Sequence, residues 1–249
     1  MKSVVAHAAT AGAGAVLLNA LPSVTAISTL RTRLTPGLSG YSETDTVALT
    51  FDDGPDPEST PAILDALAAA HVHATFFLLG SMLERAPALG AEIVAAGHEV
   101  AVHGWSHRCL LARGPVSTYR DIARGYDVIT ATTGSRPRHY RPPYGILSAA
   151  ALATARRLGL APVLWTACGK DWVRTATPDT VARRVVRELR PGATVLLHDS
   201  DCTSASGAWR ATLGAIPRIV DECAERGLVV GSLAERTPIA RHAPRSRTG

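Results

Sequence analysis

Two neighbouring carboxylates stand at the end of an apolar run in the first quarter of the chain. Asp52 and Asp53 directly follow Val47–Phe51, an apolar stretch that predicts a buried strand. The next two residues, Gly54-Pro55, predict a turn. Adjacent carboxylates repel each other unless a positive charge lies beside them. A metal ion bound by one of the two aspartates supplies that charge; a solvated turn with aspartate capping its own backbone is the alternative.

A pair of histidines is the second feature with metal-binding chemistry. His103 and His107, in the stretch HGWSH, are four positions apart, so both imidazoles reach one ion if this loop turns helically. Combined with an aspartate they make an Asp-His-His set with an open fourth position. That set suits catalytic zinc, with cobalt or another divalent transition metal as the alternative. Such an ion lowers the pKa of bound water and polarises a carbonyl. The alternative is that the two histidines have this spacing by chance.

Three further residues have types that suit proton transfer or charge pairing. Arg141 opens the rigid turn RPPYG, and we expect it to pair with a carboxylate; a surface arginine is the alternative. His198, in VLLHD, is a candidate general acid, or else a core or capping histidine. Asp171, in CGKDW, is a candidate partner for that histidine, or else an exposed loop aspartate.

The chain alternates strand-like and helix-like segments, and these must position the reactive residues. We expect strands at Val47–Phe51, Thr75–Leu79, Glu99–Val102, just before Arg141, and at Pro162–Trp165, Thr194–Leu197 and Leu228–Val230. Helices are expected from Thr60 and at Ala88–Ala96, Ser117–Thr132, Ser148–Leu158, Asp179–Leu189 and Leu213–Arg226. About seven β/α units indicate an α/β fold with a parallel sheet, either closed into a barrel or doubly wound.

All the candidate residues lie at or just past the C-terminal end of an expected strand, or in the loop that follows one. In parallel α/β folds these strand ends gather at one mouth of the molecule, where active sites lie. The placement therefore predicts that the aspartates, histidines and arginine meet in one site.

Composition narrows the class of protein. The 249 residues, 46% hydrophobic and 19% charged, suit one α/β domain and argue against disorder. No stretch combines dense basic residues with interleaved aromatics, so we expect no nucleic-acid partner in spite of the net charge of +5. The four cysteines show no C-x-x-C spacing, which excludes a zinc ribbon or thioredoxin motif but leaves disulfides open.

The two ends of the chain differ from its centre. Residues 1–40 form an apolar segment that carries no charge from Ser3 to Leu30. We interpret it as a signal peptide with a cleavage site at Val24-Thr25-Ala26, implying a secreted or cell-surface protein; a packed extension of a cytoplasmic protein is the alternative. Its length and composition do not suit a membrane span. Residues 41–235 are the expected catalytic domain, and 236–249 a flexible basic tail.

Five motifs follow one another in order: TFDDGP, HGWSH, RPPYG, W-x5-DW and VLLHD. Together they resemble the polysaccharide deacetylases of the NodB-homology family, carbohydrate esterase family 4, over Val47 to Leu233. The resemblance implies a distorted (β/α) barrel in one domain, which decides between the two architectures. The chain departs from the family pattern at Gly104, where the family usually has a serine or threonine whose hydroxyl braces the loop.

The resemblance also implies roles for the residues around the predicted ion. Asp53, His103 and His107 would bind the divalent metal, while Asp52 would act as general base. Arg141 would orient that base.

The remaining roles that the resemblance implies concern the substrate. The backbone N–H of Tyr144 would stabilise the oxyanion. Asp171 would tune His198, which would protonate the departing amine. Trp172 and Leu196 would line the pocket for the acetyl methyl group.

The function so implied is a metal-dependent hydrolase that removes N-acetyl groups from a carbohydrate such as a chitin oligomer or peptidoglycan. Two alternatives keep the chemistry and change the substrate: an O-acetyl ester such as acetylxylan, or a small acetylated metabolite. A third is a carbohydrate-binding protein on a scaffold that has lost activity. We expect a monomer whose partner is an acetylated carbohydrate or small acetylated substrate.

Overall fold

A parallel sheet of eight strands forms the centre of the computed structural model, which describes residues 16–35 and 37–236. The strands are β1 (Thr46–Asp52), β2 (Thr75–Leu78), β3 (Glu99–Val102), β4 (His139–Tyr140), β5 (Ala161–Pro162), β6 (Ala167–Cys168), β7 (Thr194–His198) and β8 (Val229–Gly231). Seven follow the order β5-β4-β3-β2-β1-β7-β6, and β8 pairs with β1. The predicted α/β class with about seven parallel strands is confirmed.

The sheet curves strongly. Strand β4 is three strands away from β1, which in a flat sheet corresponds to about 14 Å. Yet the side chain of Arg141, the residue after β4, donates hydrogen bonds to Thr50 and Asp52 on β1, at 2.8 and 2.6 Å. Only a sheet rolled towards a barrel brings these strands within reach of one side chain. The predicted distorted (β/α) barrel agrees with this curvature.

The barrel is open between its edge strands β5 and β6. The chain crosses this opening through residues 163–166, where Val163 N–H donates to Tyr140 O and Leu164 N–H to Leu38 O. The sequence predicted one strand over Pro162–Trp165, and that prediction is wrong: two short strands lie on either side of the crossing. Apolar composition alone does not show where a chain leaves one sheet edge for the other.

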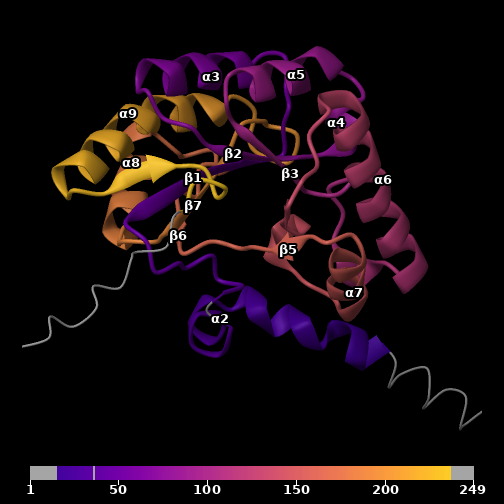
Figure 1. Cartoon of the computed structure of the whole chain (residues 1–249). Helices are drawn as coiled ribbons and strands as arrows, with labels where there is room; N and C mark the ends of the chain where they lie inside the picture. Colours follow the sequence, from indigo (N-terminus) through magenta and orange to yellow (C-terminus); the bar gives the residue numbers. More distant parts are fainter. Residues whose placement is uncertain (1–15, 36, 237–249) are drawn as a thin grey trace, which may run out of the picture.

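Helices surround the curved sheet, with α3 and α5 on one side and α8 and α9 on another (Figure 1). The principal ones are α3 (Thr60–Ala69), α4 (Gly80–Leu83), α5 (Pro87–Ala95), α6 (Pro115–Thr133), α7 (Ala149–Arg157), α8 (Pro178–Glu188) and α9 (Trp209–Glu225). Proline occupies the first turn of α3, α5, α6 and α8, and Ser148 and Thr177 cap α7 and α8. The predicted helices are confirmed within four residues at their ends, whereas the short α4 had not been predicted.

The N-terminal part packs against the opening of the barrel (Figure 1). It contains the 3-10 helix η1 (Leu21–Ala26) and α2 (Ser28–Leu34). The Arg31 guanidinium, 3% exposed, donates to Thr25 O at 2.9 Å and to Trp165 O at 2.7 Å. The first fifteen residues of the predicted N-terminal segment lie outside the described residues, and cleavage and export stay predictions.

The C-terminal end of the described chain is anchored. Arg236, counted with the predicted tail, donates to Gly40 O at 2.8 Å and Ala193 O at 2.7 Å, while residues 237–249 lie outside the described residues. Within residues 16–35 and 37–236, no helix has the length and apolarity needed to cross a membrane. All four cysteines are free thiols.

Candidate active site

The turn after β1 separates the two neighbouring carboxylates. Asp53 has a φ of 80°, a left-handed conformation that residues other than glycine rarely adopt. Asp199 holds this turn: its carboxylate accepts from Gly54 N–H at 3.1 Å and from the Thr60 hydroxyl at 2.7 Å, and its own N–H donates to Asp52 O at 3.2 Å. The sequence placed the buried Asp199 at a strand end but assigned it no role. Its contacts fix a strained conformation at the site.

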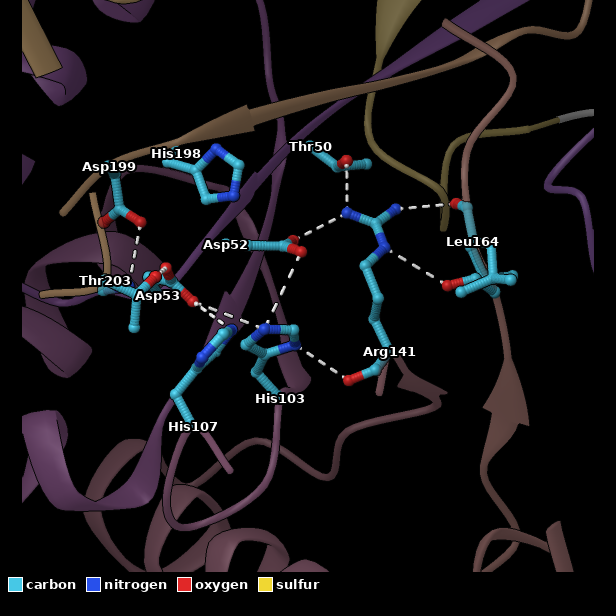
Figure 2. Close-up of polar contacts among 12 residues, drawn as sticks. Thr50, Asp52, Asp53, His103, His107, Arg141, Leu164, His198, Asp199 and Thr203 are labelled. Carbon is cyan, nitrogen blue, oxygen red and sulfur yellow. Dashed lines mark hydrogen bonds and ion pairs between the residues drawn. The ribbon is translucent and has the colours of Figure 1, made fainter. Parts of the chain in front are cut away.

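The side chains of Asp53, His103 and His107 converge on one point (Figure 2). Asp53 Oδ1 lies 3.3 Å from His103 Nε2 and 3.4 Å from His107 Nε2, and the three ligand atoms lie within 4.8 Å of one another. Although Asp53 is fully buried, its Oδ1 has no hydrogen-bond partner. A buried carboxylate oxygen without a donor, facing two imidazole nitrogens, fits a divalent cation.

Protonation of the two imidazoles also fits a metal site. His103 Nδ1 lies 2.8 Å from Arg141 O, and since a carbonyl can only accept, Nδ1 carries the proton and Nε2 keeps its lone pair. Burial, followed by the charge of His103, lowers the pKa of His107 to about 4. Burial opposes ionisation of Asp53, but the neighbouring histidines, His103 first, lower its pKa overall. The His107 imidazole is therefore neutral near pH 7, and the carboxylate beside it is ionised.

The loop that carries the histidines is not helical. The spacing of four residues predicted a helical turn, and this explanation is wrong: residues 103–107 form bends and irregular backbone. The two rings nevertheless meet, with centroids 5.2 Å apart. Their proximity therefore comes from the path of the loop and from contacts outside it.

Asp52 lies beside this cluster and pairs with a buried arginine. The Arg141 guanidinium, 0% exposed, donates to Asp52 Oδ1 at 2.6 Å, and it also donates to Val163 O at 3.2 Å and Leu164 O at 2.9 Å (Figure 2). Asp52 Oδ2 is 3.9 Å from His103 Nε2. The expected pairing of this arginine with a carboxylate at the mouth is present. One oxygen of Asp52 is held while the other remains towards the cavity.

His198 stands on the adjacent strand, in register with Asp52 on β1. Its Nδ1 lies 2.9 Å from Asp171 Oδ1, and Asp171 Oδ2 accepts from His198 N–H at 2.7 Å and from the Thr212 hydroxyl at 2.6 Å. Burial disfavours the imidazolium, but the charge of Asp171 and its hydrogen bond outweigh burial and raise the pKa of His198 to about 10. The ring is therefore protonated near neutral pH.

These groups surround a cavity of about 270 Å³. Aromatic rings and a leucine make up much of its wall. The lining residues are Asp52, His103, His107, Tyr144, Gly145, Trp165, Trp172, Leu196, His198 and Thr203. Tyr144 has a φ of 60° and packs its ring against His107, at 4.4 Å between centroids. Trp172 packs edge-on against His198. All ten residues predicted from the sequence thus lie in or directly beside one site.

Comparisons with known proteins agree with this geometry. The polysaccharide deacetylase family model matches residues 39–163. A chitooligosaccharide deacetylase from Bradyrhizobium sp. (strain ANU 289) is 37% identical over 202 residues, covering 78% of this chain and 91% of that protein. The chain belongs to the polysaccharide deacetylase family. The resemblance drawn from the five motifs, and the hydrolase class that it implies, are therefore confirmed.

Solved structures place this polysaccharide deacetylase among carbohydrate esterases of family 4. The Bc1960 peptidoglycan N-acetylglucosamine deacetylase, solved with a bound benzamide compound, has a TM-score of 0.74 and 31% identity, covering 80% of this chain and 91% of that one. A family 4 acetyl xylan esterase from Clostridium thermocellum, solved with a cobalt ion, has a TM-score of 0.70 and 30% identity, covering 76% and 89%.

Besides Asp199, sequence reasoning assigned no role to three residues of the polysaccharide deacetylase site. The Thr203 hydroxyl donates to Asp53 Oδ2 at 2.5 Å, and its position in an irregular loop gave no signal. Thr50 donates to Val195 O and accepts from Arg141. Because side chains alternate along a strand, Thr50 shares a face with Asp52, and that period could have identified it. Trp165, the first residue of the W-x5-DW motif, had been given no role; it lines the cavity from the crossing segment that was predicted as a strand.

Proposed function

We propose that this chain is a metal-dependent N-deacetylase of acetylated carbohydrates, of the chitin-oligosaccharide or peptidoglycan type. The observation that carries the proposal is the triplet Asp53, His103 and His107, with its unpartnered carboxylate oxygen, next to two separately held proton-transfer groups. Asp52 is held by Arg141 at 2.6 Å on one strand end, and His198 by Asp171 at 2.9 Å on the next.

The metal ligands and the base have separate tasks in the proposed reaction. Asp53, His103 and His107 would bind a divalent cation, zinc or alternatively cobalt. When bound, such an ion polarises a carbonyl and increases the acidity of water. Asp52, held by the Arg141 guanidinium through one oxygen, takes the proton of the attacking water with its second oxygen, which is available on the cavity side.

Cleavage of the C–N bond needs a proton on nitrogen, because an amide anion does not leave. His198, with its pKa raised to about 10, is protonated at neutral pH and donates that proton, so acetate and a free amine are formed. The backbone N–H of Tyr144 is the donor assigned to the developing oxyanion, and its left-handed backbone orients this region. Trp172 and Leu196 line the cavity where the acetyl methyl group would be accommodated.

An O-acetyl substrate is the second candidate, favoured by the similarity to an acetyl xylan esterase. An alkoxide is a better leaving group than an amide anion, so an ester makes less demand on an acid. The charged pair of His198 and Asp171 therefore favours the amide. The same retained groups argue against a binding protein without activity, because sugar binding alone requires neither a buried base nor an acid.

Acetate release tests the proposal. We would compare chito-oligomers, peptidoglycan, acetylxylan, monomeric N-acetylglucosamine and small N-acetylated metabolites, each with and without a chelator followed by zinc or cobalt. We expect release from an N-acetylated glycan that the chelator stops and the metal restores. Release only from acetylxylan would favour the esterase, and release only from a small metabolite would favour that substrate class. Sugar binding without any release would contradict the enzyme proposal.

Asp52→Asn gives the sharper control within the same assay. Since only the base is lost, we expect a fall in activity of about 100-fold or more while metal binding persists. Unchanged acetate release by a folded, metal-loaded Asp52→Asn protein would contradict the assignment of the base.

A further inference from the structure

The loop 103–107 carries two of the three proposed ligand side chains but has no regular secondary structure of its own. His103 is fixed at both ends: its N–H donates to Leu78 O at 2.9 Å and its Nδ1 bonds to Arg141 O. His107 is different, because its buried Nδ1 has no hydrogen-bond partner. The position of the His107 ring therefore depends on the path of the loop and on the Tyr144 ring beside it.

One residue of α6, Asp121, contacts this path through both its side chain and its main-chain carbonyl. Asp121 Oδ1 accepts from the Ser106 hydroxyl at 2.6 Å. Trp105 N–H donates to Asp121 Oδ2 at 3.2 Å and to the main-chain Asp121 O at 3.1 Å. Arg113 closes the network, with Nη1 at 2.9 Å from Asp121 Oδ1 and Nη2 donating to the Ser106 hydroxyl at 2.8 Å. Asp121 is only 6% exposed, so these bonds are shielded from water.

Glycines allow α6 to come this close. A Cβ atom on Gly104 would lie 2.7 Å from Asp121 Oδ2, and one on Gly125 would lie 2.6 Å from the Gly104 carbonyl carbon. On the other side, the N–H groups of Gly80 and Ser81 at the start of α4 donate to Gly104 O and Trp105 O, at 3.0 and 2.9 Å. The middle of the loop is thus clamped between α4 and α6, which lie side by side (Figure 1).

We propose that Asp121, acting with Ser106 and Arg113, is the positioning residue that sets the separation between the His103 and His107 imidazoles. In this chain a carboxylate from α6 does the bracing that Gly104, lacking a side chain, cannot do. Asp121 touches neither the ligand atoms nor the cavity, so it acts through the loop. The inference rests on the proposed function only in taking both histidines as metal ligands.

Asp121→Asn is the test, because a side-chain amide offers one oxygen where the carboxylate offers two, and so cannot accept from both Ser106 and Trp105. The variant keeps only the main-chain Asp121 O as a second acceptor for Trp105 N–H. We would titrate the metal-free full-length protein with Co²⁺ and follow its visible absorption bands. We expect the Co²⁺ dissociation constant to rise about 10- to 100-fold, and the bands to shift or lose intensity as the site geometry relaxes.

Two further variants serve as a second test and as a control. Ser106→Ala retains the Asp121–Arg113 ion pair and guards against a folding failure of Asp121→Asn; we expect a smaller loss of Co²⁺ affinity in the same direction. Asp127→Asn removes a carboxylate from the exposed side of the same helix and should leave the affinity and spectrum unchanged. Circular dichroism and the melting temperature of each metal-free protein establish folding.

A structural role alone would lower the melting temperature yet leave Co²⁺ affinity and spectrum as they are in the unmodified protein. Folded Asp121→Asn and Ser106→Ala proteins that bind Co²⁺ within twofold of the unmodified affinity, with the same bands, would overturn the inference. Absence of Co²⁺ binding in the unmodified protein would instead contradict the metal site of the proposed function, and the two failures are distinguishable.

Discussion

The three aspartates at this site have different partners, and each partner suits its aspartate to a different task. Asp52 has a guanidinium at 2.6 Å, which compensates its charge in a buried position. Asp53 has two imidazoles and a hydroxyl beside it but no guanidinium, an arrangement that suits binding of a cation. Asp171 has an imidazole and accepts three hydrogen bonds, so it raises a pKa instead of binding a metal.

The acid group gives a prediction about pH. The pKa of His198 is raised, so its acid form persists at neutral pH and is lost as pH rises through that pKa. A cation beside Asp53 opposes the imidazolium charge, so we expect an alkaline limb below pH 10 in the rate profile. Asp171→Asn removes the charge that raises the pKa, and the limb should move at least one pH unit lower.

The matched control is Asp179→Asn, which removes an exposed carboxylate on α8. It should leave the limb where it is in the unmodified protein. An alkaline limb that stays in place in Asp171→Asn would contradict the role of His198 as the acid.

Thr203 gives a second prediction at this scale. Its hydroxyl donates to Asp53 Oδ2, which leaves Oδ1 towards the histidines. Thr203→Val keeps the shape and loses the donor, so we expect zinc affinity to fall about 10-fold, as for other groups that orient a ligand. Thr203→Ser keeps the donor and should bind zinc within about threefold of the unmodified protein. Equal affinities in the two variants would show that the hydroxyl has no such effect.

At the scale of elements, strand pairing positions Asp52, and the turn after β1 then positions the proposed metal ligand Asp53. Residue pairing sets Asp52 opposite His198 on the neighbouring strand β7, so the proposed base and acid flank the same cavity. The following residues bend sharply, with the Asp199 carboxylate packed against Gly54. Burial and the nearby charge of Asp53 raise the pKa of Asp199 to about 7, although the hydrogen bond from Thr60 acts in the opposite direction.

This packing predicts that position 54 tolerates no side chain. A Cβ atom there would lie 2.0 Å from Asp199 Oδ2, so the turn must shift. We expect Gly54→Ala to lower the free energy of unfolding by about 1–3 kcal/mol, or roughly 2–12 °C in melting temperature. Gly37→Ala, whose new methyl group meets no atom within 4 Å, is the control and should change it little. Thermal unfolding measures both, and equal melting temperatures would contradict the packing argument.

At the scale of the whole molecule, the site draws on segments from nearly the full described length. The sheet must curve so that Arg141 meets Asp52, and the crossing segment must pass close enough for Val163 and Leu164 to accept from the same guanidinium. The N-terminal Arg31 donates to Trp165 O behind that segment. Metal binding should therefore require the native fold and stabilise it.

Zinc should raise the melting temperature of the whole chain. At a zinc concentration about 1,000 times the dissociation constant, binding to the native state adds about 4 kcal/mol. For a chain of this size that corresponds to a shift of about 8–16 °C, measured by differential scanning calorimetry with and without a chelator. His107→Ala removes one ligand and should abolish most of the shift. The same shift in both proteins would place the metal elsewhere.

The sequence by itself determined the identity of the reactive residues and their order. Strand patterns with polar residues at their C-terminal ends predicted a parallel α/β fold with one mouth, because parallel strand ends must gather on one side. The five motifs added the family and the ligand set. The fold inference needed only local periodicity and residue type, which sequence expresses directly, whereas the family and the ligand set came from the resemblance of the motifs.

The tertiary structure alone decided how these residues meet. The reach of Arg141 across three strand spacings depends on sheet curvature, and the irregular path of the histidine loop depends on α6. The hydroxyl of Thr203 meets Asp53 from 150 residues away along the chain. Such contacts arise from the summed packing of distant segments, and no short pattern in a single sequence specifies them.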